Sequence, residues 1–519
     1  MKIAAPLNHD PKPCLQWIEV ATSFQIPSFH IIGLPSPEVS EARERIRAAI
    51  DASHLDFPKR RVVINLSPAS VKKRGTGIDL AMALSILMGA DPERPCPYEK
   101  VVAWGELGLD GSLKSAGQIS RALYAAWEAE VDLLIIPLSE FPSINQSLEL
   151  FKKAKAFQTN PPQILAAKSL TEAWGMLSGL QAHVPAVFAL EISEKPAVRF
   201  SPPLLALPKL LERSLGISVS GKHHFLMLGS KGSGKSHAME WLIEMQTPGD
   251  AQSLVTHSLF RELGTLESKN PSPIFRRVGM HARPNALIGS TVGDSVKPGE
   301  FTLAHGGILI ADELPEWARD SREALREPLE SGRITLNRVQ KTLTLPAKFT
   351  LIANGNICPC GGWPTSLGGI EADLQIADRC KCTPMIRKQY LQRLSGPLLD
   401  RIDLLVLAGP HLNEEPSEAH PESISCLREQ IDKSLNQALS LYGAPAGWLT
   451  PNELEDFLKR FPKTKLTLDS FKLSSLRSRH KLLRIALSLA IWDGQEIPRE
   501  AHFMEGYLYR PERFNLLNA

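Results

Sequence analysis

The sequence has no apolar stretch that approaches the roughly 20 residues a helix needs to cross a bilayer. Its first residues, MKIAAP, lack the apolar segment and the cleavage site of a secretory signal peptide. Both absences argue against a membrane-spanning or exported protein. We therefore expect a cytoplasmic protein with no membrane partner.

An excess of charge of one sign is also lacking. Lys and Arg number 59, Asp and Glu number 56, and the formal net charge is +3. This balance gives no argument for or against nucleic acid, and any basic surface must be local. Hydrophobic residues at 43% and charged residues at 22% are ordinary for globular proteins, which excludes collagen-like, coiled-coil and wholly disordered chains. A chain of 519 residues is too long for one core, so about two to four domains are expected.

Cysteine is scarce, with seven in the chain, which in a reducing compartment argues against a disulfide framework. Four of the seven form two C-x-C pairs, Cys358 with Cys360 and Cys380 with Cys382. Four thiolates can complete a tetrahedral Zn²⁺ site that fixes a loop, although these pairs are tighter than the usual C-x₂₋₄-C. Free thiols are the alternative. We predict a structural zinc ion bound by all four.

The hydrophobic pattern divides the chain into four parts. Residues 1–180 are predicted to be a mixed α/β domain, and prolines punctuate 181–208 as expected of a linker. A strand–loop–helix unit then opens a second α/β domain at 209–410, and 411–519 is predicted to be helical. The clearest expected elements are strands at 62–66 and 133–137 and helices at 42–50, 79–88 and 473–492.

An apolar strand expected at 225–228 runs directly into GSKGSGKS, which matches the phosphate-loop pattern G-x-x-x-x-G-K-[ST] and precedes a helix-like segment. Glycines let the backbone curl so that its N–H groups face phosphate oxygens, and the helix N-terminus adds partial positive charge. Lys235 is expected to reach the β- and γ-phosphates of ATP, and the Ser236 hydroxyl to bind Mg²⁺. The predicted nucleotide-binding residues are Gly229, Ser230, Lys231, Gly232, Ser233, Gly234, Lys235 and Ser236.

A phosphate loop needs an acidic partner on a second strand. The apolar run 307–311 ends in Asp312 and Glu313. Asp312 is expected to hold Mg²⁺ and Glu313 to polarise the attacking water. A strand that ends in two acids is, taken alone, more often only structural, but after a phosphate loop it is the favoured partner.

A third strand, expected at 349–353, ends in the residues Asn354-Gly355-Asn356. An amide at this place can bind the γ-phosphate or the attacking water. The alternative is a turn that closes the strand, which asparagine also favours. Spacing alone does not choose between Asn354 and Asn356.

Longer motifs accompany these residues in both halves of the chain. In the C-terminal half they are KPGE at 297–300, EALREPLESG at 323–332, CPCG at 358–361 and QRLSGPLLDRID at 392–403. In the N-terminal half they are GLP at 33–35, SEARERIRAA at 40–49, NLSPA at 65–69, GTGIDL at 75–80 and GELGLDG at 105–111. With these motifs the sequence resembles, over nearly its whole length, the ComM/YifB family, the magnesium-chelatase-like branch of the AAA+ ATPases.

That resemblance implies a Lon-protease-like domain of ribosomal S5 type at 1–180, an AAA+ P-loop core with a parallel sheet flanked by helices at 209–410, and a helical lid at 411–519. It also implies a homo-hexameric ring that drives helicase or branch-migration activity on single-stranded, forked or branched DNA. The expected role is recombination of incoming DNA in natural transformation, with recombination proteins as further partners.

The resemblance also assigns residues by position. Asn356 matches the sensor asparagine, and Arg401 matches the arginine finger that acts on a neighbour's γ-phosphate. Arg477, near the start of a lid helix, matches the second sensor arginine. For a lone arginine outside such motifs, surface ion pairing is the alternative.

A β-hairpin is expected at 332–345, because apolar residues alternate in both of its arms. In related rings such a hairpin faces the central pore, so Arg338 and Lys341 near its tip are predicted to bind DNA phosphates. The alternative is a charged edge that discourages strand pairing.

The sequence departs from the family in two places. Residues 277–280 are Arg-Val-Gly-Met where relatives carry Ser-Pro-His-His, and Ile357 stands where they carry proline. A Lon-like domain also raises peptidase activity, which needs a serine activated by a lysine. Gly75 and Ile119 stand at or near those two positions, so no peptidase activity is expected.

Together these patterns predict a Mg²⁺- and ATP-dependent DNA translocase. An AAA+ remodelling ATPase that acts on a protein partner, as magnesium-chelatase motors do, is the principal alternative, and a nucleotide-dependent scaffold ring is a third. Stimulation of ATP turnover by DNA distinguishes the first from the other two.

Overall fold

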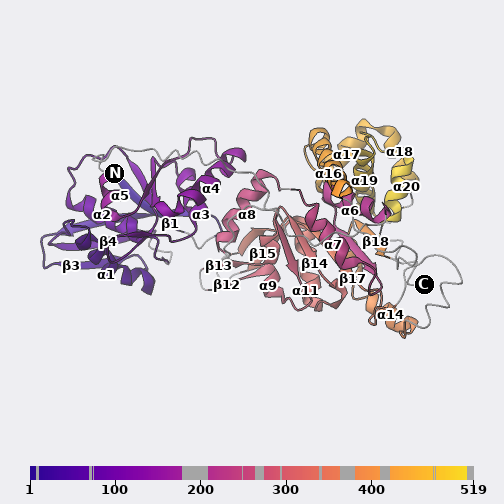
Figure 1. Ribbon diagram of the computed structural model, residues 1–519, viewed down its shortest axis with the longest axis horizontal. Coiled ribbons are helices and arrows are strands. Elements are labelled where there is room, and N and C mark those ends of the chain that lie inside the picture. Colours follow the sequence, from indigo (N-terminus) through magenta and orange to yellow (C-terminus); the bar gives the residue numbers. More distant parts are fainter. Residues whose placement is uncertain are drawn as a thin grey trace. The chain divides into compact units, whose positions relative to one another are not determined.

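The computed structural model describes residues 1–7, 11–68, 73, 75–177, 209–247, 249–263, 274–292, 295–337, 342–362, 380–408, 421–471, 473 and 475–510. The chain folds into two compact units (Figure 1). The N-terminal unit comprises Met1–Glu194, Asp250–Pro271 and Ser290–Pro298. The C-terminal unit comprises Lys195–Gly249, Ser272–Gly289 and Gly299–Ala519.

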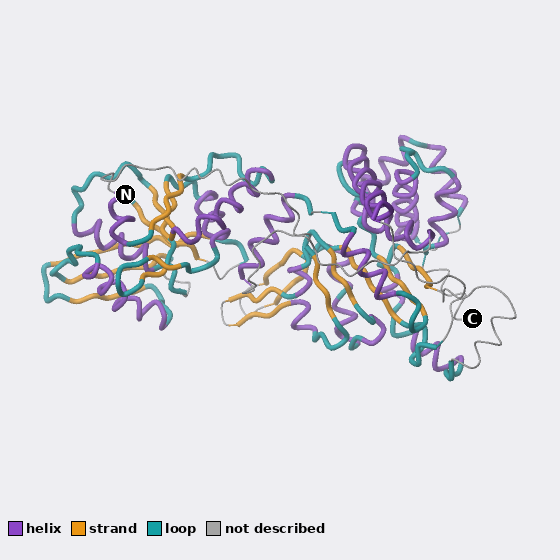
Figure 2. The backbone as a smooth tube through the Cα atoms, in the orientation of Figure 1, coloured by secondary structure: helices purple, strands orange, loops and turns teal. Residues whose placement is uncertain are grey.

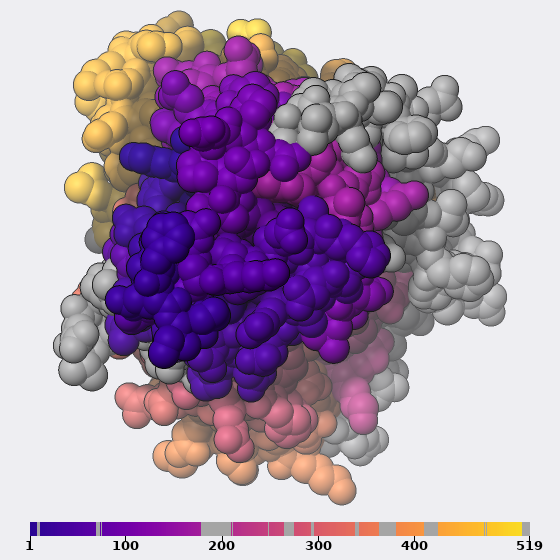
Figure 3. All heavy atoms as spheres, turned by 90° about the vertical axis from the view of Figure 1, so that its left-hand side faces the viewer, coloured from indigo at the N-terminus to yellow at the C-terminus, as the bar shows by residue number. Residues whose placement is uncertain are grey.

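A seven-stranded mixed sheet forms the centre of the N-terminal unit, which Figure 3 turns toward the viewer in indigo and purple. Its strands are β1 (Lys2–Leu7), β2 (Cys14–Ser23), β3 (Ser28–Ile32), β4 (Arg61–Ser67), β5 (Lys100–Ala103), β8 (Leu133–Pro137) and β9 (Gln163–Ala167). Their order is β3-β4-β2-β1-β5-β8-β9. β2 pairs antiparallel with β1 and β4, and the other neighbours are parallel. A short hairpin, β6 (Glu106–Leu107) and β7 (Leu113–Lys114), lies outside this sheet.

The helices that cover this sheet differ in how much of their surface is buried. They are α1 (Pro37–Ala52), α2 (Asp79–Ala90), α3 (Ile119–Glu128), α4 (Phe141–Lys153) and α5 (Leu170–Leu177), with a 3₁₀ turn, η1 (Leu138–Glu140). α1 buries one face, which includes Ile46, Ala49 and Ile50, whereas α2 is apolar all round and is buried continuously through Leu87. The predicted strands at 62–66 and 133–137 and helices at 42–50 and 79–88 all lie within these elements, and are confirmed.

A helix from the middle of the sequence completes the N-terminal unit. α8 (Ala251–Leu263) follows the phosphate-loop region in sequence, yet its Val255 and Leu259 join the core of the N-terminal unit. Its Glu262 carboxylate accepts hydrogen bonds from the backbone N–H groups of Ser120 and Arg121, at 3.1 and 3.0 Å, where α3 begins. α8, which the sequence pattern placed in the 209–410 domain, therefore packs with the first unit. Two short strands, β12 (Gly289–Val292) and β13 (Ser295–Pro298), pair with each other nearby in the sequence.

A five-stranded parallel sheet forms the centre of the C-terminal unit (Figure 2). Its strands are β10 (Phe225–Gly229), β11 (Phe275–Val278), β14 (Ile308–Ala311), β17 (Thr350–Gly355) and β18 (Leu404–Ala408), in the order β11-β14-β17-β10-β18. Successive β10 residues enter opposite hydrophobic clusters, Leu226 and Leu228 one cluster and Phe225 and Met227 the other. Both faces are thus buried, as parallel sheets require. The strands expected at 225–228, 307–311 and 349–353 are β10, β14 and β17.

Short helices and one hairpin surround this sheet. The helices are α6 (Lys209–Gly221), α7 (Lys235–Glu244), α9 (Pro284–Ile288), α10 (Glu300–Leu303), η2 (Leu314–Glu316), α11 (Arg319–Ala324), α12 (Arg326–Ser331), α14 (Pro384–Leu391) and α15 (Gly396–Leu399). The predicted hairpin is present as β15 (Arg333–Asn337) and β16 (Thr342–Pro346), paired antiparallel.

The last part of the C-terminal unit is helical, as predicted. Its elements are α16 (Pro421–Tyr442), η3 (Ala446–Trp448), α17 (Pro451–Arg460), α18 (Pro462–Ser470), α19 (Leu476–Trp492) and α20 (Glu500–Leu508). α19 corresponds to the helix expected at 473–492; it begins where the Ser475 hydroxyl accepts a hydrogen bond from the Ser478 N–H at 3.1 Å. Among the described helices, none is long and apolar enough to traverse a bilayer.

Candidate functional site

The phosphate loop joins the buried strand β10 to the start of α7. Gly232 and Gly234 have φ values of 81° and 79°, in the left-handed region that glycine tolerates best. A Cβ atom at Gly229 would lie 2.6 Å from the carbonyl oxygen of Ala408 on the neighbouring strand β18. Glycine at these positions thus lets the loop curl tightly over the end of the sheet.

Lys235 is the first residue of α7 and folds back over this loop. Its Nζ donates to the carbonyl oxygens of Gly229 and Ser230, at 3.0 and 2.6 Å. Burial lowers the pKa of the Lys235 ammonium, and the negative charge of Glu313 opposes that shift. The structure therefore brings the loop lysine into electrostatic range of the acid that follows β14. Ser236, the next residue, is exposed at the first turn of α7.

Asp312 and Glu313 follow β14 and are held there by Asn354, near the end of β17. The Asn354 Nδ2 donates to Asp312 Oδ1 at 2.9 Å, and the Glu313 N–H donates to Asn354 Oδ1 at 2.8 Å. Arg277 on β11 binds the other oxygen, Asp312 Oδ2, at 2.6 Å. Three adjacent parallel strands thus bring an amide, two acids and a guanidinium together at one edge of the sheet.

The two asparagines that spacing left open occupy different places. Asn354 lies inside β17, is 4% exposed, and bonds to the Asp312 carboxylate and to the Glu313 backbone N–H. Asn356, predicted as the sensor residue, follows the strand and lies beside the turn of the first two cysteines, within 4 Å of the position of a Cβ on Gly361. Sequence analysis noted Arg277 only as a departure from the family and did not predict its bond to Asp312, because the pairing of β11 with β14 is not visible in the sequence.

Arg401 and Arg477, predicted as arginine finger and second sensor, share one carboxylate. The Glu330 side chain on α12 pairs with Nη2 of each arginine. Arg401 also donates from Nε to the Arg326 carbonyl at 3.0 Å and from Nη1 to the Pro397 carbonyl at 2.6 Å. Burial would raise the pKa of Glu330, but the two guanidiniums hold it below its ordinary value.

Both arginines line a cavity of about 560 Å³ in the C-terminal unit. Lys348, Lys481 and Arg484 line it too, so that cations outnumber the acids in its wall. None of the residues 229–236 belongs to that wall. Within one chain, this cavity therefore brings the two arginines together without the phosphate loop.

The hairpin residues predicted to bind DNA, Arg338 and Lys341, lie outside the described residues. The arms of that hairpin, β15 and β16, are in register from Arg333 opposite Pro346 to Asn337 opposite Thr342. The exposed positions alternate along both arms, as the sequence pattern predicted.

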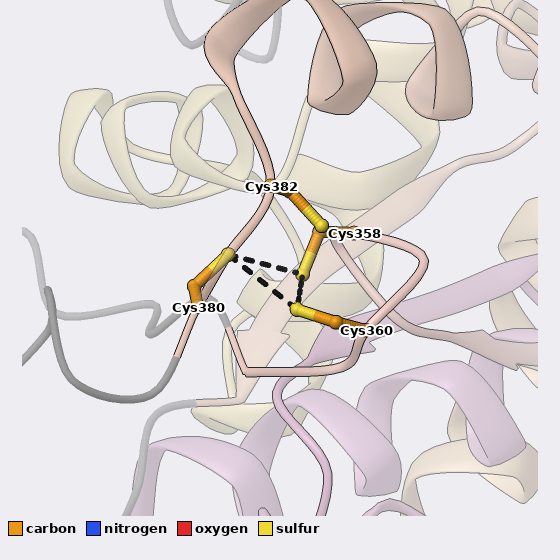
Figure 4. Close-up of side chains that lie close together, drawn as sticks. All are labelled: Cys358, Cys360, Cys380 and Cys382. Carbon is orange, nitrogen blue, oxygen red and sulfur yellow. Dashed lines mark hydrogen bonds between the residues drawn. The ribbon is translucent and has the colours of Figure 1, made fainter.

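The four grouped cysteines point toward one another (Figure 4). Cys358 and Cys360 come from the turn after β17, and Cys380 and Cys382 from the segment before α14. The Sγ–Sγ distances are 3.4 Å for Cys358–Cys360, 3.5 Å for Cys360–Cys380 and 3.7 Å for Cys358–Cys380. Tetrahedral zinc with Zn–S bonds near 2.3 Å needs sulfurs about 3.8 Å apart, close to the distances among these three thiols. With Cys382 included, the four sulfurs lie within 4.8 Å of one another, a set that could hold one metal ion. The hydrogen bond from the Gly362 N–H, together with hydrogen bonds from the three neighbouring thiols, lowers the pKa of Cys360 to about 6, which favours the thiolate that a metal binds.

Comparison with known families covers both units. Residues 208–415 match the family model described as magnesium chelatase, subunit ChlI, and residues 18–140 match a second one described as subunit ChlI of Mg-chelatase. The first match spans the phosphate loop, both acids, the cysteines and Arg401. The parallel sheet with helices on both faces is thus the core of a magnesium-chelatase-like AAA+ ATPase.

Individual relatives align over almost the full chain. Competence protein ComM of Haemophilus influenzae is 30% identical over 508 residues, which cover 95% of this chain and 94% of that protein. YifB of Salmonella typhimurium is 32% identical over 391 residues, with 75% and 71% covered. YifB of Escherichia coli is 28% identical over 521 residues, with 95% and 93% covered. On this identity and coverage, the chain belongs to the ComM/YifB family.

Proposed function

We propose that the protein is a homo-hexameric, ATP-dependent DNA motor with helicase or branch-migration activity, and that it promotes recombination of incoming DNA. The observation that carries the proposal is the array at the edge of the parallel sheet: Lys235 over the phosphate loop, and Asn354 bonded to both Asp312 and Glu313. The name of the relative competence protein ComM supports a role in natural transformation.

Each residue of the site has its own role in the proposed hydrolysis of ATP. The oxygen donors of Ser236 and Asp312 are the kind that Mg²⁺ prefers, and these residues would hold it beside the β- and γ-phosphates, where it neutralises charge. Lys235 and the loop N–H groups bind the phosphates. Asn354 fixes the backbone of Glu313, whose carboxylate then polarises the attacking water. Asn356 is proposed as the residue that senses the γ-phosphate.

Assembly into a ring would supply the further positive charge that the transition state of hydrolysis needs. In this proposal Arg401 of one copy, with Arg477 from its lid, acts on the nucleotide bound by a second copy. Neutralising the transition state across the interface makes hydrolysis depend on assembly. The cavity that holds both arginines without the phosphate loop supports such a division between subunits.

DNA contacts are proposed at the hairpin of β15 and β16. Arg338 and Lys341 near its tip would be repeated around a ring, which raises the number of phosphate contacts despite the small net charge. A double variant, Arg338→Ala/Lys341→Ala, is expected to weaken DNA binding and to flatten its dependence on salt. Unchanged binding and salt slope would remove these residues from the DNA interface.

The N-terminal unit is proposed to be a Lon-like domain that has no peptidase activity. A serine nucleophile needs an adjacent base to lower its pKa. Gly75, with a φ of 89°, and Ile119, the first residue of α3, stand at or near the two positions and carry neither group. The expected contribution of this unit is to assembly or to substrate binding.

The cysteine cluster is proposed to bind one structural Zn²⁺ per chain. Three of its thiols lie 3.4–3.7 Å apart and all four lie within 4.8 Å of one another. A closed four-thiolate site stabilises a loop without taking part in chemistry. Metal analysis of an untreated, folded preparation should find about one equivalent of zinc. Less than about half an equivalent contradicts the assignment.

The alternative is a remodelling ATPase that acts on a protein partner, which the family models named after magnesium chelatase favour. The experiment that separates the two measures ATP turnover with and without forked DNA. A DNA motor is expected to be strongly stimulated, whereas a protein remodeller or a scaffold ring is not. The variant Lys235→Ala controls for contaminating ATPases, and DNA-independent turnover by the wild type would contradict the DNA motor.

A further inference from the structure

The turn that carries the first two cysteines is bonded directly to the phosphate loop. The N–H of Lys231, in the loop, donates to the carbonyl oxygen of Gly361 at 2.7 Å. The N–H of Gly361 in turn donates to the Cys358 carbonyl at 3.0 Å. Two hydrogen bonds thus connect a predicted metal ligand to a predicted nucleotide-binding residue.

The two segments also approach closely at this point. Gly361 has a φ of 72°, in the left-handed region. A Cβ built there would lie 3.2 Å from the Cβ of Lys231 and 3.8 Å from the Cγ of Asn356. A side chain at residue 361 would therefore strain the turn and press on the phosphate loop, so that glycine is needed for both reasons.

Residues 354–361 therefore contact three parts of the site: the acidic residues after β14, the cysteine cluster and the phosphate loop. Asn354 bonds to the Asp312 carboxylate and the Glu313 backbone N–H. Cys358 and Cys360 supply two of the clustered thiols, and the Gly361 carbonyl accepts from the phosphate loop. Cys358 is fully buried, whereas Cys360 is exposed. The other two thiols come from a segment about 20 positions further on, and the Cys360 and Cys380 thiols lie 3.5 Å apart. An ion bound by all four would join this turn to that segment far more strongly than weak hydrogen bonds between thiols do.

We propose that zinc in the cysteine cluster holds the phosphate loop in its nucleotide-binding shape, through the Gly361 carbonyl and the Lys231 N–H. The metal site is then a structural regulator of ATP affinity as well as a clamp on its own loop. The inference rests on the proposed function, because it assumes that residues 229–236 bind nucleotide. Loss of one net hydrogen bond is worth about 0.5–1.5 kcal/mol, which at about 1.4 kcal/mol per tenfold corresponds to a roughly two- to tenfold loss of affinity.

The first experiment measures the affinity of the full-length chain for ADP before zinc removal, after treatment with a zinc-selective chelator, and after zinc is added back. Affinity is expected to fall by roughly two- to tenfold on removal and to recover on addition. Equal affinity in all three states, or a chain that never contained zinc, overturns the inference. Cys360→Ser, which removes one ligand, should bind ADP as weakly as the stripped wild type.

A second variant breaks the contact without touching a thiol. Gly361→Ala keeps all four cysteines and is expected to bind a full equivalent of zinc but to bind ADP several-fold more weakly. Gly494→Ala is the matched control: Gly494 has the same φ of 72° but nothing within 4 Å of its Cβ position, so ADP affinity should not change. Wild-type affinity in zinc-loaded Gly361→Ala overturns the proposed connection.

The outcomes separate this inference from the function on which it rests. If the zinc-loaded wild type binds ADP and Lys235→Ala does not, the nucleotide site stands whatever the effect of zinc. If the zinc-loaded wild type binds no nucleotide, both the proposed function and the inference fail.

Discussion

Among the described residues, two α-helices begin after a residue in the left-handed conformation, one in each unit. α3 begins after Gln118, with a φ of 57°, and α7 begins after Gly234, with a φ of 79°. Neither residue caps its helix with its own side chain. At α3, the Glu262 carboxylate from α8 accepts the first N–H groups; at α7, the preceding loop supplies glycine N–H groups and the Lys235 ammonium.

The difference shows how one electrostatic feature serves two purposes. Both helix N-termini carry partial positive charge and favour an anion. At α3 the chain provides that anion itself, so the helix dipole fastens α8 to the N-terminal unit. At α7, within the described residues, no carboxylate accepts from the first N–H groups, and the Lys235 ammonium adds a further donor, an arrangement suited to an anionic ligand that binds and dissociates. We therefore expect substitutions at α3 to change stability, and substitutions at α7 to change ATP turnover.

The largest expected effect is at α7. Lys235→Ala removes the ammonium that lies over the loop, and should lower ATP turnover by at least about a hundredfold, as loss of a charge-stabilising donor does elsewhere. Its thermal unfolding should remain close to that of the wild type. Turnover is measured by phosphate release. Retained turnover would mean that the loop at 229–236 is not the hydrolytic site.

A smaller effect is expected at α3. Glu262→Ala leaves two backbone N–H groups without their acceptor and should cost about 1–3 kcal/mol of unfolding free energy in the N-terminal unit. Urea unfolding followed by tryptophan fluorescence measures it. Glu149→Ala on the exposed side of α4 is the control and should change stability by less than about 0.5 kcal/mol. Equal effects of the two substitutions would show that the carboxylate does not fasten α8.

The elements of the nucleotide site could be predicted from sequence because they are local. β10, β14 and β17 are apolar runs, and the phosphate loop and the two acids stand directly after such runs. The hydrogen bonds of Asn354 could not be predicted, because they depend on how far β17 continues: the strand was expected to end at 353 and extends through Gly355. Only within the strand does Asn354 face Asp312 across neighbouring strands.

Contacts between distant segments could not be predicted either. The amphipathic pattern of α8 shows that it packs on something, but not that its partner is a helix more than 100 residues earlier. Arg401 and Arg477 lie 71 and 147 positions from the Glu330 that they share, and no local pattern connects them. In both cases tertiary structure brings an acid to a positive site from far away in sequence.

Glu330 is a third acidic side chain that pairs with positively charged groups, here the guanidiniums of Arg401 and Arg477. Glu330→Gln frees Arg401 and Arg477 from a carboxylate that competes with phosphate, so the protein concentration needed for half-maximal ATP turnover should fall, by roughly twofold to fivefold for two partly exposed ion pairs. The control is Glu327→Gln on the same helix, whose carboxylate accepts from Thr335 instead of from an arginine. A higher half-maximal concentration would mean that Glu330 positions the arginines for catalysis instead of restraining them.

The smallest expected effect is a pH dependence at α3. Burial raises the pKa of Glu262 above its ordinary value of 4.5, so above pH 4.5 the folded chain keeps a proton that the unfolded chain releases. Its contribution to stability is therefore greatest at low pH and declines as the pH rises through the raised pKa. Glu262→Gln has no such proton, so the difference in unfolding free energy between wild type and variant should decrease across that window and then level off. Asp79, whose pKa burial raises to about 6, titrates in both chains and cancels in the difference. A difference that instead grows with pH would mean that the two N–H groups at α3 stabilise the carboxylate more than burial penalises it.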